Sequence, residues 1–175
     1  MADTDWVLCT AATDLGDVPS IGWGSVGNIV SSNDVYANWS ASSAKNADTL
    51  KAFTFNLSIP DGSTIDGVET RVEAKRTAGT VTIGSVRIGK SDAELGTAKT
   101  PGDTLTASDA NYDHGGATDL WGLTLSETDV EASSFQIRYV FAMGASSTVN
   151  VDAVWVKVHY TPPPVRRRVA LIAKR

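Results

Sequence analysis

Side chains able to act as general bases are scarce in this chain, which holds two histidines, His114 and His159. His159 lies in an alternating apolar pattern on the side opposite the valines, which predicts a solvent-facing strand residue. His114 lies among acids in Tyr112–Gly116, which would suit an acid–base or metal role, but no second histidine, C-x-x-C or G-x-S-x-G accompanies it. We therefore predict no catalytic residues and no enzyme activity. Two carboxylates brought together by folding, as in glycosidases, remain the one open route to catalysis.

The other reactive or ligand-like groups are explained by structure. Cys9, the single cysteine, lies in an apolar stretch and is predicted to be a small buried residue. Asp109–Asp113 has oxygens at positions one, three and five of a calcium loop, but His114 replaces the required glycine and Leu120 the final glutamate. Gly22–Gly27 is not followed by the Gly-Lys-Ser/Thr of a phosphate-binding loop. We predict no metal and no cofactor.

Five tryptophans are the remaining candidates for ligand contact. Trp121 and Trp155 fall within strand patterns and are predicted to pack in the core or between sheets. Trp6, Trp23 and Trp39 lie in poorly patterned regions. An exposed ring there would serve a sugar-binding or protein-binding surface.

The charge of the chain is unevenly distributed. Residues 1–161 carry 10 basic and 20 acidic side chains, whereas residues 162–175 carry five basic and no acidic ones. Pro162–Pro164 stiffen the start of this segment as polyproline II. The acidic body disfavours nucleic acid and membrane partners.

The basic segment has two interpretations. It is either a solubilising, disordered tail or an arm that docks on a protein partner through salt bridges and apolar contacts. The partner-binding residues predicted for such an arm are Arg166, Arg167, Arg168, Val169, Leu171, Ile172, Lys174 and Arg175.

Strand-like alternation recurs along the chain, and no long helical pattern does. The alternating segments are 53–59, 65–76, 81–88, 121–125, 135–143 and 149–160. The last two are predicted to pair as a hairpin at the centre of a sheet. The inward parity shifts at Gly84–Ser85 and at Asp152–Ala153, which indicates β-bulges.

The remaining segments are less regular. Trp6–Leu8 is predicted to be a strand, and 90–116 a long loop with room for one short strand. One helical turn is predicted within 126–133, where Ser126 and Asp129 have the spacing of an N-terminal cap. These elements predict an all-β, antiparallel, jelly-roll-like sandwich over 1–161, followed by an extended C-terminal arm, 162–175. An up-and-down barrel is the alternative fold.

Composition fits one globular domain, with 42% hydrophobic and 20% charged residues. The acidic, polar N-terminal residues do not resemble a signal peptide, and no segment approaches the ~20 apolar residues of a membrane span. We expect synthesis in a cytoplasm.

Three stretches carry a family resemblance: Ser58–Val68, Gly115–Leu123 and Val151–Thr161. In this order they resemble small β-sandwich structural proteins of tailed bacteriophages, over residues 50–161. The resemblance implies a virion component without catalytic residues, made in the host cytoplasm. It does not distinguish head, neck and tail.

Three functions follow as alternatives. The first is a phage structural protein, a capsid decoration or cement protein or a neck or tail accessory, present in many copies and contacting other virion proteins. The second is a carbohydrate-binding or adhesive module of a phage fibre. The third, an enzyme, is the least favoured.

Overall fold

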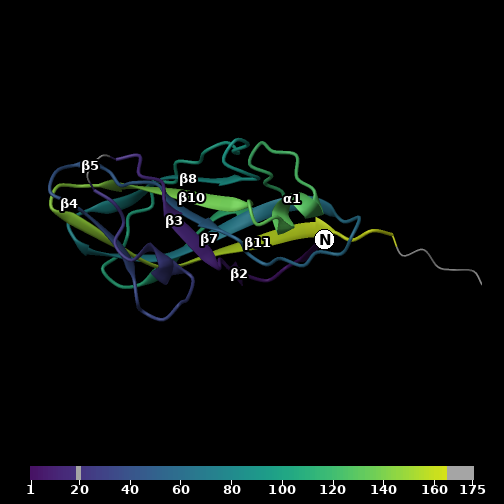
Figure 1. The fold of residues 1–175 in the computed structure, drawn as a ribbon, viewed down its shortest axis with the longest axis horizontal. Helices are drawn as coiled ribbons and strands as arrows, with labels where there is room; N and C mark the ends of the chain where they lie inside the picture. The colour runs from purple at the N-terminus through teal and green to yellow at the C-terminus, as the bar shows by residue number, and fades with distance from the viewer. Residues whose placement is uncertain (19–20, 165–175) are drawn as a thin grey trace, which may run out of the picture.

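Two antiparallel β-sheets pack face to face in the computed structural model, which describes residues 1–18 and 21–164 (Figure 1). The six-stranded sheet contains β1 (Ala2–Asp3), β2 (Val7–Leu8), β4 (Ala37–Ala41), β7 (Thr64–Ala78), β9 (Ala110–Gly116) and β11 (Ser147–Thr161). The five-stranded sheet contains β3 (Ala11–Asp14), β5 (Lys45–Asn46), β6 (Leu50–Phe53), β8 (Val81–Gly89) and β10 (Gln136–Met143). The predicted all-β sandwich is therefore confirmed, and the described residues form two separate sheets in place of a closed barrel.

Strand β11 is the centre of the six-stranded sheet. One of its edges pairs with β7 from Thr148 to Thr161. The other edge pairs in turn with β4, β2 and β1. Its inward valines Val154, Val156 and Val158 are fully buried. A one-residue slip would turn these valines outward, so the burial pattern fixes the register.

The predicted hairpin between 135–143 and 149–160 is wrong. Strand β10 pairs with β8, β6 and β5, whereas β11 belongs to the opposite sheet. The connection Gly144–Ser146 crosses from one sheet to the other. Each strand has one strongly apolar face, and these faces meet across the core. Apolar alternation reports a buried face, and it does not identify the hydrogen-bonded neighbour.

The expected strand over 53–59 is also corrected. Strand β6 ends at Phe53, and Thr54 and Asn56 have positive φ angles of 58° and 49°. Such left-handed residues interrupt a pleated strand. Phe55, Leu57 and Ile59 are nevertheless buried, so the alternation marked core residues correctly in a segment outside the ladder.

Several local predictions are confirmed. The β10–β8 register shifts opposite Gly84, and the β11–β7 register shifts between Val151 and Ala153. Trp6–Leu8 contributes β2, and the long loop after β8 contains the single strand β9. Helix α1 (Glu127–Glu131) begins at Ser126, which forms a capping box with Asp129. A 3-10 turn, η1 (Val26–Ile29), precedes β4.

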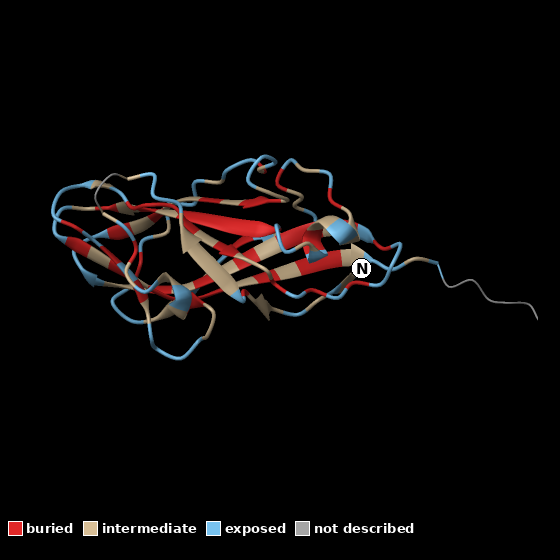
Figure 2. Cartoon of the chain, viewed as in Figure 1, coloured by how far each residue is buried: buried red, intermediate tan, exposed pale blue. Residues whose placement is uncertain are grey.

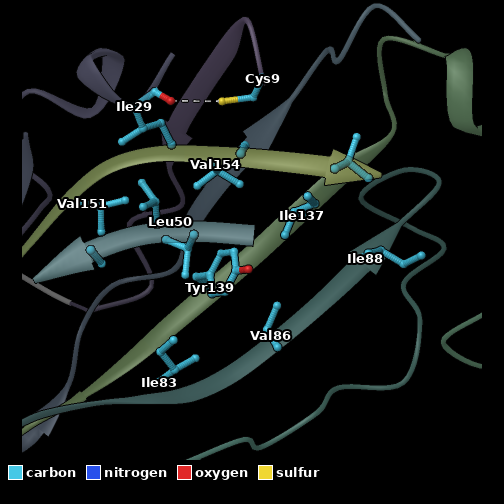
Figure 3. Packing of buried hydrophobic residues seen from close by; sticks show 14 of the residues in the cluster. Cys9, Ile29, Leu50, Ile83, Val86, Ile88, Ile137, Tyr139, Val151 and Val154 are labelled. Carbon is cyan, nitrogen blue, oxygen red and sulfur yellow. Dashed lines mark hydrogen bonds between the residues drawn. The ribbon is translucent and has the colours of Figure 1, made fainter. Parts of the chain in front are cut away.

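The core fills the space between the two sheets along the whole length of the sandwich (Figure 2). Figure 3 shows side chains of β8 and β10 in this layer, together with Val154 of β11. The largest fully buried rings belong to Trp39, Trp121, Tyr139, Phe55, Phe135 and Phe141. No described helix is long and apolar enough to cross a membrane.

Candidate functional site

The tryptophans divide into a buried group and a surface pair. Trp23, Trp39 and Trp121 are buried in the core, as predicted for Trp121 only. Trp6 and Trp155 are half-buried and belong to no part of the core cluster. The prediction that Trp155 packs in the core or between the sheets is wrong. The alternation along β11 could have shown this position, because Trp155 lies between the inward Val154 and Val156 and must face outward.

Cross-strand pairing aligns the surface pair with charged side chains. Leu8 of β2 lies opposite Trp155, which lies opposite Arg71 of β7, which lies opposite Asp113 of β9. Residues directly opposite each other point to the same face of a sheet. The row therefore runs from apolar to charged across four strands.

A second row lies next to the first. Lys157 of β11 is opposite Glu69 of β7, and His159 follows two residues later on the same face. The Trp6–Trp155 face is defined as Trp6, Leu8, Trp155, Lys157, His159, Glu69, Arg71 and Asp113. All but Trp6 belong to paired strands, so the sheet itself holds them in place.

The ring of Trp6 contacts both cations of the face. The Arg71 guanidinium carbon lies 4.2 Å from the ring centroid, and Lys157 Nζ lies 4.7 Å from it. These distances are within the range of cation–π attraction. The contacts hold the Trp6 side chain against the sheet, although Trp6 precedes β2.

Ion pairs fix the charged side chains. Arg71 donates from Nε and Nη2 to the two oxygens of Asp113 at 2.6 and 2.7 Å. The adjacent carboxylate raises the pKa of Arg71 above its ordinary value. His159 Nε2 lies 2.6 Å from Glu69 Oε1. The pair of Arg71 and Asp113 is partly exposed, whereas His159 is buried, so the prediction of a solvent-facing His159 is wrong. Both pairs orient the groups that they join.

His114 lies in the sandwich interior, which corrects its expected place in a loop. It belongs to β9 and is buried. Its Nε2 lies 3.0 Å from Asp103 Oδ2, and its Nδ1 lies 3.4 Å from the hydroxyl of Tyr139. The Tyr139 hydroxyl also lies 2.8 Å from Thr70 Oγ1, so the network connects the two sheets. Burial lowers the pKa of His114 below 6.5.

Cys9 is buried, as predicted. Its thiol donates to the carbonyl oxygen of Ile29 at 3.4 Å (Figure 3). Burial raises the pKa of the Cys9 thiol to about 12. A thiolate nucleophile is thus not available at neutral pH.

Asp109–Asp113, the stretch that resembles a calcium loop, leads into the beginning of β9, and its two outer acids pair with different cations. Asp109 Oδ2 accepts from Lys75 Nζ at 2.9 Å, while Asp113 pairs with Arg71. The glycine-rich stretch Gly22–Gly27 leads into η1, and Gly24 forms a bridge with Asn38. Neither stretch provides a ligand cradle. The predicted arm residues, Arg166 to Arg175, lie outside the described residues.

The described surface contains no pocket. The Trp6–Trp155 face is therefore not part of an enclosed cavity. An open row of aromatic and charged side chains on a rigid sheet can contact an extended polymer or another protein surface. Small-molecule chemistry instead favours a concave, water-excluding site.

Comparisons with known proteins give only distant structural similarity. No family model matches the chain, and no curated protein matches it. Similar solved structures include TmCBM61 in complex with β-1,4-galactotriose, with a TM-score of 0.45 and 9% identity over 87% of this chain and 88% of that one. The CBM22-1 xylan-binding domain of Paenibacillus barcinonensis Xyn10C gives a TM-score of 0.47 and 8% identity over 90% and 94%.

A third similar structure is the N-terminal cellulose-binding domain of Cellulomonas fimi β-1,4-glucanase C. It gives a TM-score of 0.37 and 13% identity over 91% of this chain and 90% of that one. TM-scores below 0.5 with identities this low establish no shared family or function for this chain.

Proposed function

We propose that the protein is a non-catalytic binding module whose Trp6–Trp155 face binds a polysaccharide. The observation that carries the proposal is the position of Trp6 and Trp155, half-buried and outside the core, on one rigid sheet face. An indole offers an apolar surface that suits the C–H face of a sugar ring. The adjacent Arg71, Asp113 and Glu69 offer donors and acceptors to sugar hydroxyls.

The shape of the face favours a polymer over a small ligand. No pocket encloses a ligand among the described residues, so affinity must come from several shallow contacts along a chain. The strands also fix the spacing of these contacts before binding. Such preorganisation reduces the entropy cost of association.

The test compares two aromatic residues on opposite sheets. Trp155→Ala removes the central ring of the proposed site. Phe53→Ala is the matched control, because Phe53 is half-buried on the five-stranded sheet and has Lys51 Nζ 5.1 Å from its ring centroid. Binding to xylan, galactan, β-glucan and bacterial capsule polysaccharides is measured by affinity electrophoresis and calorimetry. Trp155→Ala should weaken binding about tenfold or more, as expected for loss of a central aromatic contact, while Phe53→Ala should leave it intact.

Two results would count against this function. Binding to no polysaccharide in the panel, or equal binding by both variants, would remove the Trp6–Trp155 face as a sugar site. Release of reducing ends above a heat-killed control, abolished by one Asp or Glu substitution, would instead indicate a depolymerase.

The resemblance over residues 50–161 supports a second proposal, a role as a phage structural protein. The net charge of −10 in residues 1–161 and of +5 in residues 162–175 favours attachment through the arm. The two proposals are compatible if the module is part of an adhesive fibre. They differ in which surface carries binding, the sheet face or the arm.

A further inference from the structure

Three carboxylates gather at one end of the five-stranded sheet. Asp14 is the last residue of β3, Asp17 lies in the loop that follows, and Asp48 lies just before β6. Strands β3 and β6 are paired, with Asp14 opposite Leu50. This pairing brings together acids that are more than 30 residues apart in the chain.

Asp17 holds the chain just before β6. One of its oxygens accepts from the backbone N–H of Thr49 at 2.8 Å, and the other accepts from the Thr49 hydroxyl at 2.6 Å. Asp14 is held similarly, with Oδ2 accepting from the N–H of Trp23 at 2.7 Å. Local donors thus fix both carboxylates near Asp48.

Asp48 is the unusual member of the cluster. Its side chain is fully buried, and Oδ1 accepts from the N–H of Val18 at 2.9 Å. Oδ2 is also buried and has no hydrogen-bond partner. Asp17 and Asp14 lie close enough to Asp48 to pair with it if one of the carboxyl groups carries a proton. A buried, unpartnered carboxylate oxygen is expensive and calls for a compensating group.

No side-chain cation supplies that compensation. Among residues 1–18 and 21–164, no lysine, arginine or histidine forms an ion pair with Asp14, Asp17 or Asp48. Because Asp48 is buried, its charge is poorly solvated, and it repels the neighbouring carboxylates unless a proton or a cation lies between them.

We propose that Asp17 and Asp48 bind a hard divalent cation, Ca²⁺ or Mg²⁺, with Asp14 adding negative potential beside it. Carboxylate oxygens are the protein ligands that both ions prefer. No group of three or more acidic, cysteine or histidine side chains in the described part of the chain is spaced to hold a metal, so only two carboxylates are assigned as direct ligands. Asp17 is exposed, which leaves room for water in the remaining coordination positions. The ion would join the loop after β3 to the start of β6.

The test uses the full chain after treatment with EDTA. Ca²⁺ and Mg²⁺ are titrated at neutral pH by calorimetry, and thermal melting is followed at increasing ion concentration. Saturable binding at one site is expected, with a Tm that rises as the ion concentration rises above its Kd. A Tm that does not change with either ion, together with no heat of binding, would overturn the proposal.

Variants separate a cation site from a shared proton. Asp48→Asn and Asp17→Asn should each weaken cation binding by about tenfold or more, as loss of one of two charged ligands implies. The amide introduced by Asp48→Asn can donate to Asp17, so the fold should persist. Asp61→Asn, at an exposed acid in a turn, is the control and should bind like the parent. If Asp48→Asn raises the Tm of metal-free protein while the Tm of the parent changes with neither ion, Asp17 and Asp48 share a proton and the cation site is excluded.

The cation site and the polysaccharide face lie on different sheets, so their tests are independent. Trp155→Ala should retain the response to Ca²⁺ or Mg²⁺, and Asp48→Asn should retain the sheet face. A failure of one proposal therefore leaves the other in place.

Discussion

At the scale of single residues, the chemistry of this protein is determined by burial more than by residue type. Cys9 and His114 are reactive types, yet both lie inside the sandwich with local hydrogen-bond partners. Burial disfavours the charged form of each, raising the pKa of the thiol and lowering that of the imidazole. The environment of His114 could not be predicted from its neighbours in the sequence, because Asp103 and Tyr139 contact it from other segments.

The lowered pKa of His114 predicts a pH effect on stability. The unfolded chain takes up this proton near pH 6.5, before the folded protein does. His114 therefore contributes to stability above pH 6.5, and that contribution is lost as pH falls below 6.5 toward the folded-state pKa. Asp48 acts in the opposite sense, because its raised pKa makes stability fall as pH rises from about 3.8 to about 6.

Variants isolate the His114 contribution from that of Asp48. Urea unfolding is measured between pH 5 and 8 for the parent and for His114→Gln. The parent should lose more free energy of unfolding on acidification than His114→Gln loses. His159→Gln removes the other histidine and should keep the parental pH dependence due to His114. Identical pH profiles for the parent and His114→Gln would contradict the prediction.

At the scale of elements, the alternation of apolar residues predicted which face of a strand is buried, but it did not predict which strands pair. The inward sets of β7 and β11, Val68, Thr70, Val72 and Ala74 with Val154, Val156 and Val158, are all buried as expected. The pairing of β10 was not predictable in this way, since its partners β5, β6 and β8 come from distant parts of the chain. Two-residue strands such as β1 and β5 are too short to show any period.

The same distinction applies to the candidate site. Trp155 and Lys157 could be assigned to the outer face from their parity against Val154, Val156 and Val158. Their proximity to Arg71 and Asp113 depends on the β11–β7–β9 order, which no local pattern contains. The position of Trp6 above Arg71 depends on the same order.

The burial of β11 makes a sharp prediction for Val156. Its side chain is fully buried between the sheets, so Val156→Asp places a charge where no partner is available. The variant should lose several kcal/mol of unfolding free energy, a large part of a typical domain's stability. Asn150→Asp adds a charge to the same strand at a half-buried position and should change stability by only about 0.5 kcal/mol. Melting of Val156→Asp at the parental temperature would show that this face is not packed.

At the scale of the whole molecule, the N-terminal strand β1 and the last residues of β11 lie together at one end of the sandwich. Strand β1 pairs with the last residues of β11, so the N-terminal strand lies beside the exit toward residues 162–175 (Figure 1). Lys157 and His159 of the Trp6–Trp155 face lie on the same stretch of β11. The proposed polymer surface and the point where residues 162–164 leave the sandwich are thus on the same stretch of β11, which suits a module that joins two bodies.

Deletion of residues 162–175 separates these two roles. The last ladder pair is Thr161 with Thr64, and no core residue follows it in the described chain, so the deleted protein should melt within about 0.5 kcal/mol of the parent. Polysaccharide binding should persist, because the Trp6–Trp155 face is intact. Co-sedimentation with phage particles assembled without this protein should be lost, because residues 162–175 carry five basic side chains and no acidic one.

A charge variant controls for the length of the arm. Replacement of Arg166, Arg167 and Arg168 by Ser keeps the chain length and removes three of the five basic groups of the arm. Charge-driven docking predicts that this variant binds particles more weakly than the parent and that added salt weakens parental binding. If the deletion variant still sediments with particles as the parent does, attachment must come from the folded body, and the sheet face becomes the candidate contact for both partners.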